Sequence, residues 1–389
     1  MEAKPILTVL DDEEAIGLLI AEVARDMGYE VQTYTSVKDF KQNLAHDMEI
    51  LCLDLMMPEE DGVEVIRYLA TLNNKAKLIL MSGFDKRVLK SASIMAKTQG
   101  LSVAAELNKP FSIKYLQEII GHCKLPEARA SSERQELSAE EIELAISEDR
   151  VFVQYQPKID LTKNRVFGAE ALVRIRDQDN NIVPPGLFIR VAESSGAIVA
   201  ITRKVIDQSI AFCSRLKKLG HNLNIAINMP AQLLGDISLT DELVSKIKAG
   251  GLETSNITVE ITESALVENY AVSLDVLTRL RMKGVLLSID DFGTGYSTMQ
   301  QLKNIPFTEM KLDQSFVMDI FDQDAGVIIS KSIELSHELG LQVLAEGVET
   351  IEVARELMAR GCDYCQGYYF SRPVDADDFV DYLTTKTPL

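Results

Sequence analysis

The sequence predicts two α/β domains: a doubly wound (βα)5 domain followed by a (β/α)8 barrel of the TIM type. Three observations lead to this fold class. With 389 residues, the chain is longer than one hydrophobic core usually supports. Apolar strand patterns alternate with helical patterns along the chain, which is typical of parallel sheets covered by helices. A polar segment without either pattern interrupts them, so we expect domains at 1–124 and 139–389 and a linker at 125–138.

The first domain should contain five strands that alternate with helices. In its first helical pattern, Ile16, Leu19, Val23 and Met27 fall on one face, and Gly28 is a suitable stop. The expected strands lie at 5–10, 30–34, 49–55, 76–82 and 101–111, and the helices delimited by pattern lie at 14–28, 61–72, 86–98 and 112–123.

The second domain is about the size of one eight-stranded barrel. It begins with a helix at which Ser138 is the expected N-cap and Glu141 its capping-box partner. Helical patterns separate most of the strand candidates. These candidates lie at 151–159, 166–175, 223–229, 257–263, 285–292, 309–313, 342–349 and 364–370.

Composition excludes several classes of function. The net charge of −19 argues against DNA binding, which needs Lys and Arg to neutralise phosphates. A phosphate ligand would therefore need a bound metal as its source of positive charge. Neither a signal peptide nor an apolar run of about 18 residues is present, so we expect a cytoplasmic chain without membrane insertion. Cys362 and Cys365 lack the second ligand pair of a zinc site, which favours simple packing.

The first group of candidate site residues lies at the predicted strand ends of the first domain. These residues are Asp11, Asp12, Asp54, Ser82 and Lys109. Ligands of open α/β sheets bind outside these ends. Clustered carboxylates suit Mg²⁺, and a carboxylate beside Mg²⁺ and lysine can attack a phosphoryl donor. The alternative reading is a set of unrelated, solvated loop acids.

Residues 4 to about 123 resemble the receiver domain of two-component response regulators. The resemblance rests on "LDDEE", "LCLDLMMPEEDG", "MSGF" and "NKPF". It implies Asp54 as phospho-acceptor, Asp11 and Asp12 as Mg²⁺ ligands, Ser82 as switch hydroxyl, Lys109 as phosphate-binding cation, and a sensor histidine kinase as partner. Two features depart from the family: the segment from Ser82 to Lys109 is longer than usual, and Glu106 replaces the usual switch aromatic residue.

The second group places polar side chains on seven of the eight predicted barrel strands. They are Glu170, Asn228, Glu260, Asp290 with Asp291, Lys311, Glu346 and Gln366. Active sites of such barrels lie at the C-terminal strand ends. The alternative is a structural network of ion pairs, but unpaired buried carboxylates cost several kcal/mol each, so this set demands cations. Adjacent Asp290 and Asp291 can share a site only if their strand ends and the chain bends, which Gly293 and Gly295 would permit.

Residues 139 to about 387 resemble the EAL-domain family of cyclic di-GMP phosphodiesterases. The matching motifs are "YQPKI", "GAEALVR", "VPPGLFI", "INMPAQL", "VEITES", "IDDFGTGYS", "MKLDQSFV", "AEGVET" and "GCDYCQGYYFSRP". Pro230 departs from the family, which usually has Ser there.

The resemblance implies two Mg²⁺ or Mn²⁺ ions. It assigns Glu170, Asn228, Glu260 and Asp290 to the first ion, and Asp290, Asp291 and Glu346 to the second. It further implies Lys311 as the residue that orients the attacking water, Gln366 beside the metals, Gln156 and Arg174 as substrate contacts, and Glu263 as a brace for the loop 291–297.

The expected function is two-metal hydrolysis of cyclic di-GMP to linear pGpG, regulated by phosphorylation of Asp54. The resemblance also implies a homodimer or a larger homo-oligomer. The alternative is a catalytically silent cyclic di-GMP receptor that acts through protein partners. Such receptors usually lack some catalytic residues, whereas Glu170, Lys311 and Glu346 are all present here.

Overall fold

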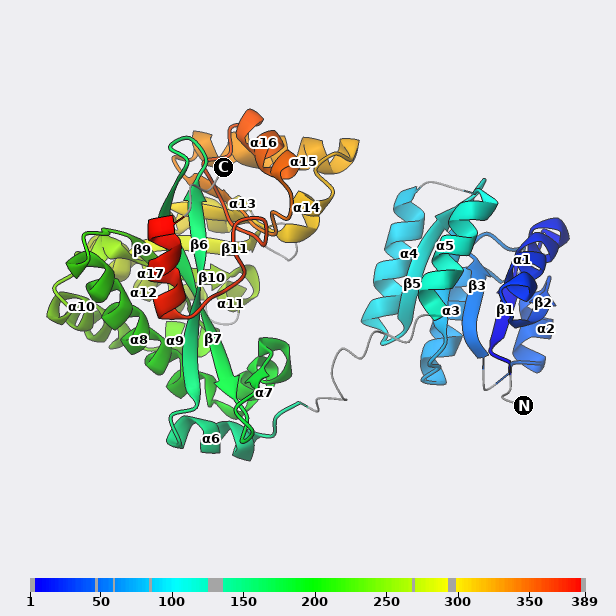
Figure 1. Cartoon of the computed structure of the whole chain (residues 1–389), viewed down its shortest axis with the longest axis horizontal. Helices are drawn as coiled ribbons and strands as arrows, with labels where there is room; N and C mark the ends of the chain where they lie inside the picture. Colours follow the sequence, from blue (N-terminus) through cyan, green and yellow to red (C-terminus); the bar gives the residue numbers. More distant parts are fainter. Residues whose placement is uncertain are drawn as a thin grey trace. The chain divides into compact units, whose positions relative to one another are not determined.

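The computed structural model describes residues 4–45, 48–58, 60–83, 86–124, 136–267, 270–292 and 299–385. They belong to two compact units that divide between residues 133 and 134 (Figure 1). Residues 125–135, most of the expected linker, lie outside the described residues. No helix in the described ranges is long and apolar enough to cross a membrane.

The first unit is a five-stranded parallel sheet with the strand order β2-β1-β3-β4-β5. Its strands are β1 Ile6–Leu10, β2 Glu30–Tyr34, β3 Met48–Asp54, β4 Lys77–Ser82 and β5 Ser102–Asn108. Its helices are α1 Glu14–Asp26, α2 Val37–Gln42, α3 Gly62–Thr71, α4 Lys86–Thr98 and α5 Ile113–Lys124. The predicted doubly wound (βα)5 fold is confirmed.

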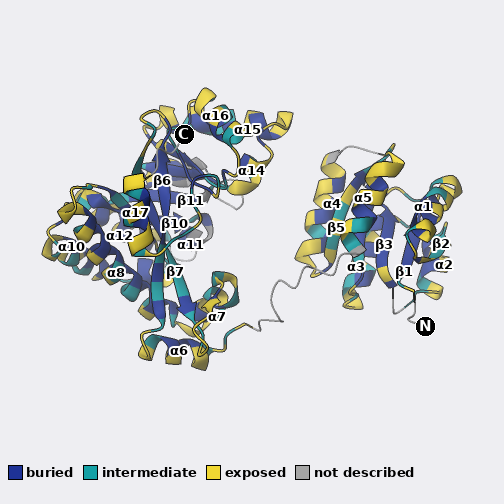
Figure 2. Ribbon diagram, in the orientation of Figure 1, coloured by how far each residue is buried: buried dark blue, intermediate teal, exposed yellow. Residues whose placement is uncertain are grey.

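Both faces of this sheet are covered, and each face has its own core (Figure 2). In β3, Leu51 and Leu53 pack into one core, whereas Ile50 and Cys52 pack into the other. This alternation follows from the two-residue period of a strand. Because apolar side chains fill both faces of the sheet, the polar residues of the candidate site lie at the strand ends.

The second unit is a closed eight-stranded barrel with one short extra strand at its rim. Its strand order is β6-β14-β13-β12-β11-β10-β9-β7, closed by the pairing of β6 with β7. The strands are β6 Val151–Asp160, β7 Arg165–Arg176, β8 Ile182–Val183, β9 Asn224–Asn228, β10 Ile257–Thr262, β11 Leu286–Phe292, β12 Glu309–Leu312, β13 Gln342–Ala345 and β14 Tyr364–Cys365. The predicted TIM-like barrel is confirmed.

The barrel is covered by helices whose exposed residues face outward (Figure 2). The α-helices are α6 Ala139–Ser147, α7 Ile189–Ser195, α8 Ile198–Lys218, α9 Ala231–Leu234, α10 Leu239–Ala249, α11 Glu263–Val267, α12 Tyr270–Met282, α13 Met299–Asn304, α14 Gln314–Met318, α15 Gln323–Glu338, α16 Ile351–Ala359 and α17 Ala376–Thr385. Two 3-10 helices, Pro185–Leu187 and Thr254–Asn256, lie between them. The predicted capping box of α6 is present: Ser138 Oγ accepts from Glu141 N at 3.2 Å, and Glu141 Oε2 accepts from Ser138 N at 2.8 Å.

The first barrel strand differs from the regular all-parallel arrangement. β6 pairs antiparallel with both β7 and β14, whereas the other barrel strands pair in parallel. A tight turn connects β6 directly to β7 where a crossover helix would otherwise be, and consecutive strands joined by a turn must run in opposite directions. β6 consequently begins at the end of the barrel where the parallel strands finish, which we call the mouth, and it runs toward the opposite end, the floor. Lys158 therefore lies farther from the mouth than Gln156.

Two barrel strands are much shorter than predicted. β13 ends at Ala345 and β14 at Cys365, so Glu346 and Gln366 stand immediately after their strands. Gly367 allows the two segments that follow these strands to approach closely, since a Cβ at this position would lie 2.1 Å from the carbonyl oxygen of Val348. The Val348 N–H donates to the Gln366 carbonyl at 3.1 Å, which holds the two segments side by side.

Candidate functional sites

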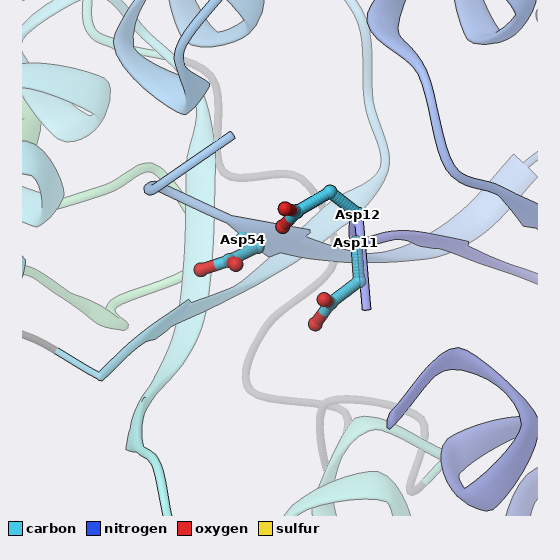
Figure 3. A group of neighbouring side chains, drawn as sticks. All are labelled: Asp11, Asp12 and Asp54. Carbon is cyan, nitrogen blue, oxygen red and sulfur yellow. The ribbon is translucent and has the colours of Figure 1, made fainter. Parts of the chain in front are cut away.

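The five predicted residues of the first unit gather at one edge of its sheet. Asp11 and Asp12 follow β1, Asp54 ends β3, Ser82 ends β4 and Lys109 follows β5. One carboxylate oxygen from each of the three aspartates lies within 4.8 Å of the others (Figure 3). Asp11, Asp54 and Ser82 are buried, whereas Asp12 is exposed. We name these three aspartates the acidic cluster.

Lys109 is the cation nearest to the acidic cluster among the described contacts. Its Nζ lies 2.8 Å from Asp11 Oδ2 and 2.9 Å from Asp54 Oδ2. Burial alone would lower the pKa of Lys109, but the two carboxylates raise it overall, so the ammonium stays charged. Burial raises the pKa of Asp11, an effect that Lys109 only partly offsets. Three carboxylates beside one ammonium leave an excess of oxygen donors, which fits a hard divalent cation.

Glu13 and Glu106 are two further acidic residues of this unit. Glu13 was not predicted, although its carboxylate lies 3.6 Å from Lys109 Nζ and its N–H donates to Asp11 Oδ1 at 3.0 Å. The "DDEE" run contained that signal. Glu106, at the family's aromatic position, is exposed on β5.

In the second unit, four predicted carboxylates surround the ammonium of Lys311. Lys311 is only 1% exposed. Its Nζ contacts Glu346 Oε1 at 2.8 Å, Glu260 Oε2 at 3.0 Å, Asp290 Oδ1 at 3.0 Å and Glu170 Oε1 at 3.8 Å. These side chains come from five different strands or strand ends, so only the closed barrel can assemble them.

Two amides complete this group. Gln366 Nε2 donates to Glu170 Oε2 at 2.7 Å and to Glu346 Oε1 at 2.8 Å, and Asn228 Nδ2 donates to Glu170 Oε1 at 2.9 Å. The side-chain amide oxygen Oε1 of Gln366 is buried and accepts no hydrogen bond from the described residues. A buried acceptor without a donor is costly unless a cation or a water meets it.

The electrostatics of the group also favour additional cations. Burial, reinforced by the neighbouring carboxylates, raises the pKa of Glu346 to about 8 despite the nearby Lys311, and it raises the pKa of Glu170 as well. Burial would also raise the pKa of Glu260, but Lys158 and Lys311 together lower it to about 2. The two ammonium groups therefore compensate the charge of Glu260 but only part of the charge of Glu170 and Glu346. An oxygen-rich, buried and anionic site is suited to divalent metal ions.

Asp290 and Asp291 lie at a bulge inside β11, which ends at Phe292 as the predicted range 285–292 does. The expectation that the strand ends at the two aspartates was therefore wrong. β11 continues to Phe292, but Ile289 pairs with Met310 and Phe292 pairs with Leu312. Two residues of β11 therefore oppose the single residue Lys311. A bulge of this kind re-aims side chains without ending the strand. The side chain of Asp291 and residues 293–298, including Gly293 and Gly295, lie outside what the structure describes.

A cavity of about 720 Å³ opens beside the carboxylates. Its lining includes Arg174, Asn228 and Glu260 together with apolar residues of β7, α7, α8 and the loop after β9. Arg174 Nε donates to Gln154 Oε1 at 3.0 Å, which leaves the guanidinium beside the cavity. Gln156 pairs with Glu170 across the two strands and donates to Ser371 O at 3.1 Å, but it does not line this cavity. Glu263 is buried at the start of α11.

Sequence reasoning missed the ionic layer beneath the mouth. Lys158, 1% exposed, lies 2.6 Å from Glu260 Oε1 and 3.5 Å from Glu309 Oε1, and Ser288 Oγ donates to Glu309 Oε1 at 2.8 Å. A lysine two residues after Gln156 in the strand pattern "YQPKI" was an available signal. The identity of its partners was not, because they come from β10 and β12.

Taken together, the two units define a response-regulator-type chain: a (βα)5 domain with an acidic cluster, followed by a barrel with a carboxylate-lined mouth. The family model described as "EAL domain" matches residues 139–373, and the one described as "Response regulator receiver domain" matches residues 7–121. The chain therefore belongs to the EAL domain family and carries a receiver domain before its barrel.

Known proteins resemble the chain over different lengths. Cyclic di-GMP phosphodiesterase RocR of Pseudomonas aeruginosa is 31% identical over 349 residues, which is 87% of each chain. Cyclic di-GMP phosphodiesterase PdeR of Escherichia coli K12 is 36% identical over 60% of this chain and 36% of its own length. A solved structure described as the PaMucR phosphodiesterase in complex with c-di-GMP has a TM-score of 0.59 and 33% identity, and the match covers 62% of this chain and 98% of that one.

Proposed function

We propose that this chain hydrolyses cyclic di-GMP to linear pGpG, and that phosphorylation of Asp54 regulates the reaction. The observation that carries the proposal is the convergence of Glu170, Glu260, Asp290 and Glu346 on one buried position at the barrel mouth. The names of RocR and PdeR, both cyclic di-GMP phosphodiesterases, support the choice of substrate.

The carboxylates and amides would hold two divalent ions, Mg²⁺ or Mn²⁺. Domains of both families generally bind divalent metals. Glu170, Asn228, Glu260 and Asp290 would hold one ion, and Asp290, Asp291 and Glu346 would hold the other. When bound, the ions supply positive charge to the phosphate oxygens and acidify a water molecule. Without that charge, a chain of net charge −19 would repel a dianionic dinucleotide.

Lys311 and Gln366 would position the water. The Lys311 ammonium contacts the carboxylates of Asp290 and Glu346. Once those carboxylates have other counter-ions, its N–H groups are available to orient a water oxygen in line with the leaving 3′-oxygen. The water oxygen forms a bond to phosphorus, the P–O3′ bond breaks, and the 3′-oxygen takes up a proton, which gives pGpG.

The cavity beside the carboxylates would accept part of the dinucleotide. Its apolar lining suits the faces of a guanine base, and Arg174 suits a phosphate or a base edge. Gln156, on the opposite side of Glu170, would contact the other part of the substrate. Glu263 would brace the loop 291–297, through which two copies of the chain would form a homodimer or a larger homo-oligomer.

The acidic cluster would receive a phosphoryl group from a sensor histidine kinase. The Asp54 carboxylate forms a bond to phosphorus while the phosphorus–nitrogen bond of the kinase's phosphohistidine breaks. Mg²⁺ held by Asp11 and Asp12 would offset the negative charge, Lys109 would pair with the phosphoryl oxygens, and Ser82 would donate its hydroxyl to them.

Chromatography of the nucleotides tests the catalytic proposal. The full chain is incubated with cyclic di-GMP and Mg²⁺ or Mn²⁺, with EDTA as the metal-free control and Glu170→Gln as the matched variant. We expect pGpG only from the unchanged chain with metal. Tight nucleotide binding without pGpG under any metal condition would overturn hydrolysis in favour of a silent receptor.

A further inference from the structure

Lys158 is a fully buried cation to which none of the roles above has been assigned. It lies on β6, the antiparallel strand of the barrel, two residues below Gln156. Both carboxylates that it contacts are themselves largely buried, since the Glu260 side chain is 0% exposed and that of Glu309 is 11% exposed. Burying an ammonium removes it from water at a cost of several kcal/mol, so its carboxylate partners must compensate that cost.

Lys158 contacts one carboxylate of the group at the barrel mouth, Glu260, and a second carboxylate, Glu309, that lies outside that group. Lys158 Nζ lies 2.6 Å from Glu260 Oε1 and 3.5 Å from Glu309 Oε1. Glu309 in turn accepts from Ser288 Oγ at 2.8 Å. Burial would lower the pKa of Lys158, but Glu260 and Glu309 raise it overall, so it remains an ammonium.

The two oxygens of Glu260 are divided between two lysines. Oε1 contacts Lys158, and Oε2 contacts Lys311 at 3.0 Å. The lysines approach from β6 and β12, so rotation of the carboxylate would break both contacts. Oε1 is consequently held toward the floor, and only Oε2 faces the group at the mouth.

We propose that Lys158 is a positioning residue that holds Oε1 of Glu260 and thereby presents Oε2 alone to a metal ion at the barrel mouth. This inference rests on the metal site of the proposed function. Residues that orient a metal ligand typically change metal affinity by about 10- to 100-fold when they are replaced.

Two variants separate positioning from simple charge repulsion. Lys158→Met removes a positive charge near the site, so electrostatics alone would make a divalent cation bind more tightly. Lys158→Arg keeps the charge but replaces a compact ammonium with a wide planar guanidinium, which turns the carboxylate. Positioning predicts weaker binding in both variants, whereas charge alone predicts tighter binding in the first and no change in the second.

The experiment is a calorimetric titration of the full chain with Mn²⁺. Every sample carries Asp12→Asn and Asp54→Asn, so that the acidic cluster of the receiver domain is weakened alike. Lys204→Met, which removes a partly exposed lysine on α8 of the barrel unit that pairs with Asp149, is the matched control. Circular dichroism of each sample establishes that it is folded.

We expect a dissociation constant about 10-fold higher or more for Lys158→Met, an intermediate increase for Lys158→Arg, and no change for Lys204→Met. Equal or tighter Mn²⁺ binding by a folded Lys158→Met overturns the positioning role. If that variant does not fold, Lys158→Arg decides, and an unchanged affinity there overturns the role. Failure of the unchanged barrel to bind Mn²⁺ would instead remove the proposed metal site, and the positioning role with it.

Discussion

Lys311 on β12 and Glu346, immediately after the neighbouring strand β13, are joined by a 2.8 Å contact between Nζ and Oε1. The same ammonium reaches Glu260 and Asp290 at 3.0 Å each. Lys311 is the counter-charge that these three carboxylates share, and Glu260 has Lys158 as a second partner. The proposed hydrolysis and the stability of the barrel would therefore depend on the same residue.

Replacing Lys311 with Met should destabilise the metal-free chain by about 3–5 kcal/mol, because it leaves buried carboxylates without their partner. Hydrolysis should fall by about 100-fold or more with the loss of a group that positions the reacting water. Saturating Mn²⁺ should restore more stability to this variant than it adds to the unchanged chain, because the ions replace the missing charge. Urea unfolding in EDTA and in Mn²⁺ measures both effects, with exposed Lys331→Met as control. The same loss of stability in both solutions would contradict the shared counter-charge.

Gly367→Ala should disturb the site without altering any polar side chain. Its Cβ would lie 2.1 Å from the Val348 carbonyl oxygen, so the segment carrying Gln366 must move away from Glu346. We expect a loss of about 1–3 kcal/mol from overpacking, together with weaker Mn²⁺ binding. Gly235→Ala is the matched control, since its nearest contact is at 3.7 Å and its φ is −83°. Thermal melts and Mn²⁺ titrations of both variants are the measurements, and indistinguishable variants would refute the close-packing argument.

Lys109→Met should impair phosphoryl transfer to Asp54. The ammonium lies 2.9 Å from Asp54 Oδ2, and its loss leaves both buried aspartates and the incoming phosphoryl group without a nearby lysine. Incorporation of labelled phosphate from acetyl phosphate should fall by about 100-fold, which is the scale of losing one preorganised charge contact. Lys97→Met, on an exposed face of α4, should label normally, and Asp54→Asn gives the background. Normal labelling of Lys109→Met would show that another cation serves the phosphoryl group.

The turn between β6 and β7 provides a prediction about pH. Asp160 accepts hydrogen bonds from Thr162 N at 3.1 Å, Thr162 Oγ1 at 2.7 Å and Lys163 N at 2.9 Å. Burial would raise the pKa of Asp160, but these bonds and Lys163 lower it overall. A carboxyl group with a depressed folded-state pKa stabilises the fold above its unfolded pKa, and this contribution disappears as the pH falls through the folded value.

Asp160→Asn should therefore cost about 1.5–3 kcal/mol at neutral pH. The difference from the unchanged chain should shrink once the pH drops below about 4. Urea unfolding across this range provides the measurement. A pH-independent difference would mean that the amide, and not the charge, is responsible for the loss.

Much of both sites was accessible from local sequence. Asp54 and Glu260 could be located because each terminates or interrupts an apolar strand pattern, and strand ends meet at one edge of a sheet. The capping box at Ser138 was also predictable, because both of its hydrogen bonds join residues only three positions apart. Strand lengths were less predictable where apolar residues resume after a polar residue and a glycine, as Val348 does after Ala345 and Tyr368 does after Cys365.

The sequence by itself determined the fold class, the strand ends that carry polar residues and the family to which the chain belongs. Each of these depends on patterns within a few residues or on motifs that can be read directly. Only the tertiary structure decided the reversed direction of β6, the bulge at Asp290 and Asp291, and the partnership of Lys158 with Glu260. Those features depend on pairing between strands far apart in the chain, where closure of the barrel and the desolvation of buried charges select the partners.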